Sequence, residues 1–125
     1  GSSRPAASVE WPPSRGGMSR SQVQRITDHM KQHLDEPIGL QELADLVGLS
    51  RFHMCTAFRR ATGQTPHQWL VRLRISEARR LLQDQRLSVT EIAFAVGNQT
   101  PSSFAQAFRA LVRMTPTAYR QLTVD

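Results

Sequence analysis

The sequence predicts an all-α fold of seven helices, arranged as two similar halves joined by a long central helix. From residue 20 onward, apolar residues recur at the spacing of helix faces. No window shows the sustained alternation of apolar and polar residues that a half-buried strand would require. Capping residues, prolines and glycines divide the helical pattern into short segments. These three observations favour helices packed on helices.

The first 18 residues differ from the rest, because they hold several prolines, glycines and serines without apolar periodicity. Such a segment buries too little apolar surface to offset its ordering entropy. We expect residues 1–18 to be a flexible leader or interdomain linker, whose first three residues are a remnant of cloning. The domain proper is predicted to span residues 19–125.

Three short helices are predicted in the first half. The first carries an apolar stripe and is expected to end at Pro37; the stripe is Val23, Ile26, Met30 and Leu34. The second ends at Gly48, since glycine adopts the left-handed conformation that follows many helices; its stripe is Leu40, Leu43, Ala44 and Val47. Ser50 caps the third, whose inward-facing residues are Met54, Ala57, Phe58 and Ala61.

Four further helices follow. Thr65-Pro66 is a cap followed by proline at the first helical position, and it opens a long helix to about Gln83. Ser88 and Glu91 form a capping box for a fifth helix, which ends at Gly97. The last two helices start at the cap-proline pairs Thr100-Pro101 and Thr115-Pro116. The apolar stripe of the sixth helix is Phe104, Phe108 and Leu111.

The two halves repeat the same motifs. Glu42-Leu43-Ala44 and Val47-Gly48 recur 49 residues later as Glu91-Ile92-Ala93 and Val96-Gly97. Phe58-Arg59 and Thr65-Pro66 recur 50 residues later as Phe108-Arg109 and Thr115-Pro116. Each half therefore has a short helix, a glycine turn and a second helix with one free face, as in a helix-turn-helix unit that binds the DNA major groove. The seven helices thus form two helix-turn-helix units, about 21–64 and 88–123, joined by a central helix over 66–83.

Charge is distributed unevenly along the chain, which has a net charge of +6. Residues 1–49 hold five Lys or Arg and six Asp or Glu, whereas residues 50–125 hold eleven Arg and four Asp or Glu. This asymmetry favours a polyanionic partner, either nucleic acid or an acidic membrane face. The single cysteine excludes an internal disulfide, and no apolar run is long enough to cross a bilayer. We therefore expect a soluble, cytoplasmic protein.

The chain resembles the AraC/XylS family over residues 20–122. The matching stretches are Leu40-Gln41-Glu42-Leu43-Ala44, Gly48-Leu49-Ser50-Arg51-Phe52-His53, Phe58-Arg59-Arg60-Ala61-Thr62-Gly63, Thr65-Pro66, Arg74-Ile75-Ser76-Glu77-Ala78-Arg79-Arg80-Leu81-Leu82, Glu91-Ile92-Ala93 and Met114-Thr115-Pro116-Thr117-Ala118-Tyr119-Arg120. The chain departs from the family at Asn98, where phenylalanine is usual, and at Arg113, where glycine is usual. Both departures leave the turn geometry and DNA contacts of the second unit open.

The resemblance implies binding to double-stranded DNA and regulation of transcription, often activation through contact with RNA polymerase. It also implies a separate N-terminal domain for effector sensing or dimerisation, which this chain lacks. A central helix over 66–83 would be about 27 Å long. That length suits two reading heads about one DNA turn, roughly 34 Å, apart.

On the free face of the third helix, the family's base-reading positions match Phe52, Cys55 and Thr56. The free face of the sixth helix carries the other predicted base readers, Ser102, Ala105 and Gln106. Gln106 is the strongest of these candidates, because a glutamine amide pairs bidentately with adenine. Phe52 and Thr56 could pack on a thymine methyl group, but Phe52 could equally be an ordinary packed aromatic residue.

Phosphate contacts are predicted for Arg51, Arg59, Arg60, Arg109, Arg113 and Arg120, and for backbone N–H groups near Pro101. The arginines could instead belong to a solvated surface. Arg74 differs, since helical spacing places it among apolar residues. We expect it to form a structural ion pair that braces the two units, with DNA contact as the alternative.

Three other classes of function are weighed. Cys55 beside His53 could suggest an enzyme, but neighbouring helix positions do not face each other, and the zinc-binding cysteines of AraC-like alkyl-transfer proteins are missing. His29 and His33 have metal-ligand spacing without a third ligand. A membrane or protein-interaction module would need a long amphipathic anchor, and the apolar stripes of this sequence are instead shared among seven helices that pack on one another. We therefore expect no catalytic residue, metal or cofactor.

Overall fold

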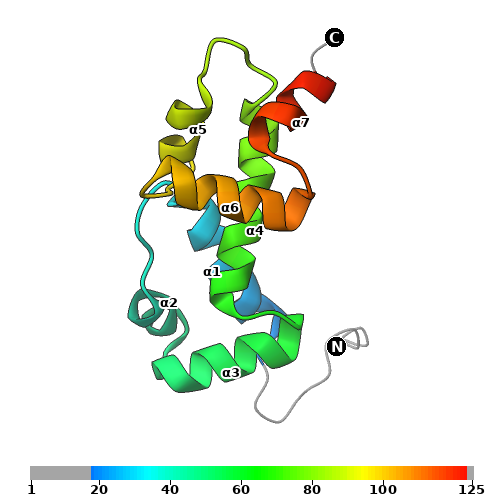
Figure 1. Ribbon diagram of the computed structural model, residues 1–125. Coiled ribbons are helices and arrows are strands. Elements are labelled where there is room, and N and C mark those ends of the chain that lie inside the picture. Colours follow the sequence, from blue (N-terminus) through cyan, green and yellow to red (C-terminus); the bar gives the residue numbers. More distant parts are fainter. Residues whose placement is uncertain (1–17, 124–125) are drawn as a thin grey trace. The chain divides into compact units, whose positions relative to one another are not determined.

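The computed structural model describes residues 18–123, which form seven α-helices and contain no β-strand (Figure 1). The helices are α1 (Arg20–Gln32), α2 (Leu40–Val47), α3 (Arg51–Thr62), α4 (Pro66–Leu81), α5 (Val89–Ala95), α6 (Pro101–Val112) and α7 (Pro116–Thr123). The all-α class predicted from the sequence is confirmed.

Two compact units make up this part of the chain. One comprises residues 18–32 and 38–69, and the other comprises residues 33–37 and 70–123. Helix α4 therefore contributes its first turn to the first unit and the rest of its length to the second. The central helix also ends at Leu81, two residues before the predicted end.

The first unit has a core in which Ile26, Met30, Met54 and Phe58 are fully buried. Helix α1 begins with a reciprocal cap, since the Ser19 N–H donates to Gln22 Oε1 (3.0 Å) and the Gln22 N–H donates to Ser19 Oγ (3.2 Å). Three sequence predictions change at the edges of this unit. Met18, assigned to the leader, is buried, and Leu40, assigned to the apolar stripe of the second helix, is 40% exposed. Ala61, assigned to the core, is only half-buried. The rest of the predicted leader, residues 1–17, lies outside the described residues.

Helix α1 ends at Gln32, earlier than its apolar stripe suggested. Residues 33–37 belong to the second unit, where the Arg74 guanidinium on α4 donates to the carbonyls of Leu34 (3.1 Å) and Glu36 (2.9 Å). The expected ion pair of Arg74 is therefore corrected to hydrogen bonds with backbone carbonyls. Burial lowers the pKa of Arg74, while the nearby Asp35 carboxylate acts in the opposite direction.

The core of the second unit is one cluster that includes Ile75, Leu82, Ile92, Phe104 and Phe108. Leu111, predicted to continue the stripe of α6, is 40% exposed. Val112 packs against the cluster in its place, because it lies one turn after Phe108 on the same side of the helix.

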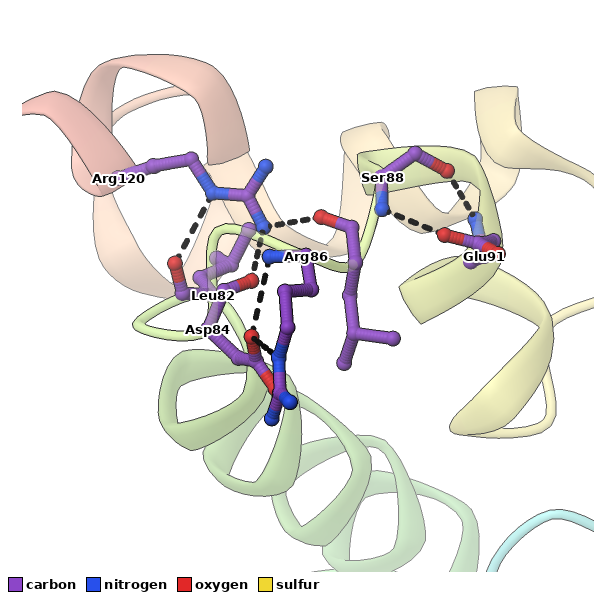
Figure 2. A network of polar contacts seen from close by, with 7 residues as sticks. Leu82, Asp84, Arg86, Ser88, Glu91 and Arg120 are labelled. Carbon is purple, nitrogen blue, oxygen red and sulfur yellow. Dashed lines mark hydrogen bonds and ion pairs between the residues drawn. The ribbon is translucent and has the colours of Figure 1, made fainter.

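Arg120 on α7 forms hydrogen bonds with the segment that joins α4 and α5 (Figure 2). Its guanidinium donates to the carbonyls of Leu82 (2.9 Å), Asp84 (3.2 Å) and Leu87 (2.6 Å). In the same loop the Asp84 carboxylate accepts from the Arg86 guanidinium (3.0 and 3.1 Å), and these hydrogen bonds lower the pKa of Asp84. The predicted capping box then starts α5, as Ser88 and Glu91 exchange bonds of 2.7 and 3.0 Å.

Candidate nucleic-acid interface

The first turn places α3 directly after α2. Gly48 adopts the left-handed conformation (φ +70°), in which its N–H bonds back to the carbonyls of Ala44 and Asp45. Ser50 then caps α3, its Oγ accepting from the His53 N–H at 3.1 Å. Met54, Ala57 and Phe58 bury one face of α3. Burial of that face leaves the opposite face of α3 at the surface.

The free face of α3 carries an aromatic ring and basic side chains. Phe52 is 77% exposed, and Arg51, Arg59 and Arg60 are also exposed. Cys55 and Thr56 lie one turn after Phe52 and are half-buried. The structure therefore gathers the predicted residues of the first unit on one helix. It also removes the alternative that Phe52 is a packed core residue.

The second turn is one residue longer and more tightly surrounded. Gly97 has φ +90°, and a Cβ atom built there would lie 2.6 Å from the Leu34 carbonyl oxygen and 3.0 Å from the Arg74 guanidinium. Asn98 is half-buried, with its Nδ2 3.5 Å from Ser103 Oγ. Thr100 caps α6, its Oγ1 accepting from the Ser103 N–H at 3.0 Å. The Asn98 side chain therefore contacts the first turn of α6.

The free face of α6 is polar. Phe104 and Phe108 are fully buried, whereas Ser102, Gln106 and Arg109 are exposed and Ala105 is half-buried. Pro101 occupies the first helical position and is exposed. The predicted base readers of the second unit, with Pro101 and Arg109, thus also lie on one helix, whereas Arg113 follows α6 and Arg120 lies on α7.

The same backbone conformation follows the C-terminal ends of α3 and α6. Gly63 follows α3 with φ +82°, and Arg113 follows α6 with φ +72°. Arg113 is the one non-glycine residue with positive φ in residues 18–123. The departure from glycine at Arg113 therefore keeps the left-handed turn, at a cost in backbone strain.

Aromatic packing repeats in the same way. The rings of Phe58 and Trp69 meet edge to face with centroids 5.7 Å apart. Their counterparts 50 residues later, Phe108 and Tyr119, meet edge to face at 5.6 Å. Arg79 lies 5.5 Å from the centroid of the Tyr119 ring and donates to its hydroxyl.

Several arginines of the basic second half make contacts within the protein. Arg120 is half-buried on three carbonyls, so its geometry does not support the predicted phosphate contact. Arg80 pairs with Glu77, and Arg86 pairs with Asp84. These pairs raise the pKa of Arg80 and of Arg86. Part of the positive charge that suggested a polyanionic partner is therefore paired or hydrogen-bonded within the second unit.

His53 is a surface residue that the sequence analysis did not assign to the interface. It is exposed in the first turn of α3, with its ring centroid 6.3 Å from that of Phe52. The signal available in the sequence was its place three residues after the Ser50 cap, which puts it at the same end of the helix as Phe52.

The two histidines with metal-ligand spacing each pair with a carboxylate. His29 bonds to Glu42 at 2.5 Å, and His33 pairs with Glu36 at 3.3 Å. No group of three or more His, Cys, Asp or Glu side chains in residues 18–123 is placed to hold a metal ion. In the same range no helix has the length and apolar character needed to span a membrane.

Two helix-turn-helix units with capped, surface-exposed second helices define a DNA-binding domain. The chain matches the helix-turn-helix domain family over residues 43–122. It belongs to the AraC-type helix-turn-helix family of DNA-binding transcription regulators.

Solved structures agree with this assignment. An AraC-type transcriptional regulator from Chromobacterium violaceum superposes with a TM-score of 0.77 at 26% identity, over 83% of this chain and 93% of that one. The DNA-binding domain of the global transcriptional factor AdpA, solved with a target DNA, gives a TM-score of 0.75 at 32% identity, over 81% and 91%.

Curated relatives are longer proteins. The probable transcriptional regulator LumQ of Photobacterium leiognathi is 34% identical over 95 residues, which are 76% of this chain and 38% of the relative. The MmsAB operon regulatory protein of Pseudomonas aeruginosa is 34% identical over 93 residues, which are 74% and 30%. The chain thus spans about a third of the length of the curated relatives that it matches.

Proposed function

We propose that the chain binds double-stranded DNA sequence-specifically, with α3 and α6 each entering a major groove. The observation that carries this proposal is the repeated arrangement of a glycine with positive φ, a capped helix and an exposed helix face. Each of these faces begins at the N-terminal end of its helix, which is the end that contacts base edges in helix-turn-helix proteins. The similarity to AdpA, whose DNA-binding domain was solved with DNA, supports the same partner for this chain.

Base edges are read by Phe52, Cys55 and Thr56 on α3 and by Ser102, Ala105 and Gln106 on α6. Gln106 is the principal hydrogen-bonding reader, since its exposed amide can donate to and accept from adenine at once. These contacts specify the sequence, whereas contacts with phosphates fix the position of the protein.

Phosphates are bound by exposed arginines beside the two faces, which are Arg51, Arg59, Arg60, Arg109 and Arg113. At the start of α6 the Ser102 N–H is the donor suited to a phosphate. Pro101 has no N–H, and the Ser103 N–H already donates to Thr100. Arg120 is left out of this set because of its carbonyl contacts.

The domain works as part of a longer cytoplasmic regulator that activates transcription through RNA polymerase. Support for a longer protein comes from the relatives, of which this chain spans about a third. An N-terminal domain that senses an effector or dimerises would supply the regulation.

Selection of bound duplexes from a random pool tests the proposal, followed by measurement of affinity against salt concentration. We expect a two-part motif, and Gln106→Ala should relax one position in one part. Gln85→Ala is the matched control, because Gln85 is an exposed glutamine in the α4–α5 loop. Binding to every duplex with equal, steeply salt-dependent affinity would refute sequence reading, and no binding at low salt would refute DNA binding itself.

A further inference from the structure

Phe52 is the most exposed of the large apolar side chains in the described residues, at 77%. Leaving a phenyl ring in water forgoes most of the stabilisation that its burial would give. Phe52 is the second residue of α3, directly after the capped turn. A side chain at that position of the second helix reaches base edges when the helix enters a groove.

The neighbours of Phe52 on the same face are also poor at reading hydrogen-bond patterns. Cys55 and Thr56 lie three and four residues later, so all three side chains share one side of α3. A thiol is a weak donor, and a threonine hydroxyl can turn to donate or accept. A phenyl ring, a thiol and a threonine methyl group together form a face that distinguishes bases by apolar contact.

We propose that α3 reads the C5 methyl groups of pyrimidines, so that its half-site is defined by thymine, or equally by 5-methylcytosine, opposite Phe52. This inference rests on the proposed function, in which α3 enters the major groove. The thymine methyl group is the only apolar feature of a base pair that the major groove displays. 5-Methylcytosine carries a methyl group at the same ring position, and a phenyl ring does not distinguish the exocyclic groups beside it.

The second unit provides an internal contrast. Fifty residues after Phe52 and Thr56 lie Ser102 and Gln106, which are exposed and polar. Gln106 reads hydrogen-bonding groups that do not depend on a C5 methyl group. Sensitivity to methyl groups at the position opposite Phe52 is therefore a property of α3 and independent of Gln106.

Uracil substitution tests this inference, since uracil pairs like thymine and lacks only the methyl group. A duplex recovered by selection is remade with uracil at one thymine at a time, and dissociation constants are measured by fluorescence anisotropy at fixed salt. We expect one position in the α3 half-site at which uracil weakens binding about fourfold, the value for one methyl group removed from an apolar contact. Phe52→Ala should abolish this difference between thymine and uracil, whereas Gln106→Ala should keep it.

A second comparison uses cytosine and 5-methylcytosine at the same position. Methylation should tighten binding of the wild-type protein about fourfold and leave binding of the Phe52→Ala protein unchanged. Because Phe52 is exposed, this variant should fold normally, which circular dichroism can verify. Specific binding with no uracil-sensitive thymine in the α3 half-site, or with equal sensitivity in both proteins, would overturn the inference alone. Failure to bind any duplex would instead refute the proposed function.

Discussion

Substitution of Gly97 by alanine should destabilise the second unit much more than the same change in the first turn. Two separate costs arise at Gly97. A Cβ atom at φ +90° is disfavoured by about 1–2 kcal/mol. That atom would also lie 2.6 Å from the Leu34 carbonyl oxygen, which already accepts from Arg74 Nε. Relief of this overlap requires movement of packed backbone, at about 1–3 kcal/mol.

Gly48 is the matched control. It has φ +70°, but a Cβ atom built there meets nothing within 4 Å, so Gly48→Ala should cost only the backbone contribution. The total for Gly97→Ala is then about 2–5 kcal/mol, against about 1–2 kcal/mol for Gly48→Ala. For a domain of this size each kcal/mol lowers the melting temperature by about 4–8 °C.

Urea unfolding followed by circular dichroism measures both variants, and amide chemical shifts locate the change. For Gly97→Ala the shifts should spread to residues 33–37 and to the Arg74 side chain. Equal loss of stability in the two variants would refute the steric part of the reasoning. In that case the close approach of Gly97 to Leu34 would not affect the free energy of unfolding.

Three further changes test other parts of the second unit. Arg113→Gly should raise the free energy of unfolding by about 0.5–1 kcal/mol, because it relieves a strained φ but adds chain entropy to the unfolded state. It should also reduce the slope of DNA affinity against salt concentration by about one. A loss of stability would contradict the strain at this position. Arg120→Ala should lower the free energy of unfolding by about 2–4 kcal/mol, since three carbonyls lose their donor. The slope of DNA affinity against salt concentration should stay unchanged. A normal fold with a reduced slope would instead support the phosphate contact predicted from the sequence. Hydrogen bonds from Arg86 lower the pKa of Asp84 in the folded state, so this pair contributes stability above the ordinary Asp pKa of about 3.9 and that stability is lost as the pH falls below this value. Asp84→Asn should therefore flatten this part of a curve of stability against pH. An unchanged curve would contradict the pair.

The features predicted well from the sequence are those with local causes. The caps at Ser50, Ser88 and Thr100 act on N–H groups three residues away, so a short stretch of sequence contains both partners. The left-handed turn at Gly48 likewise depends on a single residue. Because these signals recur in both halves, the second helix of each unit could be predicted from the sequence alone.

The features missed have distant or competing causes. The partners of Arg120 lie 33 to 38 residues earlier in the chain, and backbone carbonyls leave no mark in the sequence. Arg74 is similar, because its partners lie 38 and 40 residues away. The choice between Leu111 and Val112 depended on a difference of one residue in helical phase, which only packing against the cluster decides.

The repeat also bears on the kind of DNA target. At positions 50 residues apart on α3 and α6, the predicted base readers all differ: Phe52 corresponds to Ser102, Cys55 to Ala105 and Thr56 to Gln106. The one shared position on these faces is Arg59, which corresponds to Arg109. Phosphates are alike everywhere on DNA, whereas bases differ. Two units that share a phosphate-binding arginine but differ in their base-reading residues are therefore suited to two different sequences. The proposed domain should therefore select an asymmetric site with two different halves, and a motif made of two identical halves would mean that the readers have been assigned to the wrong residues.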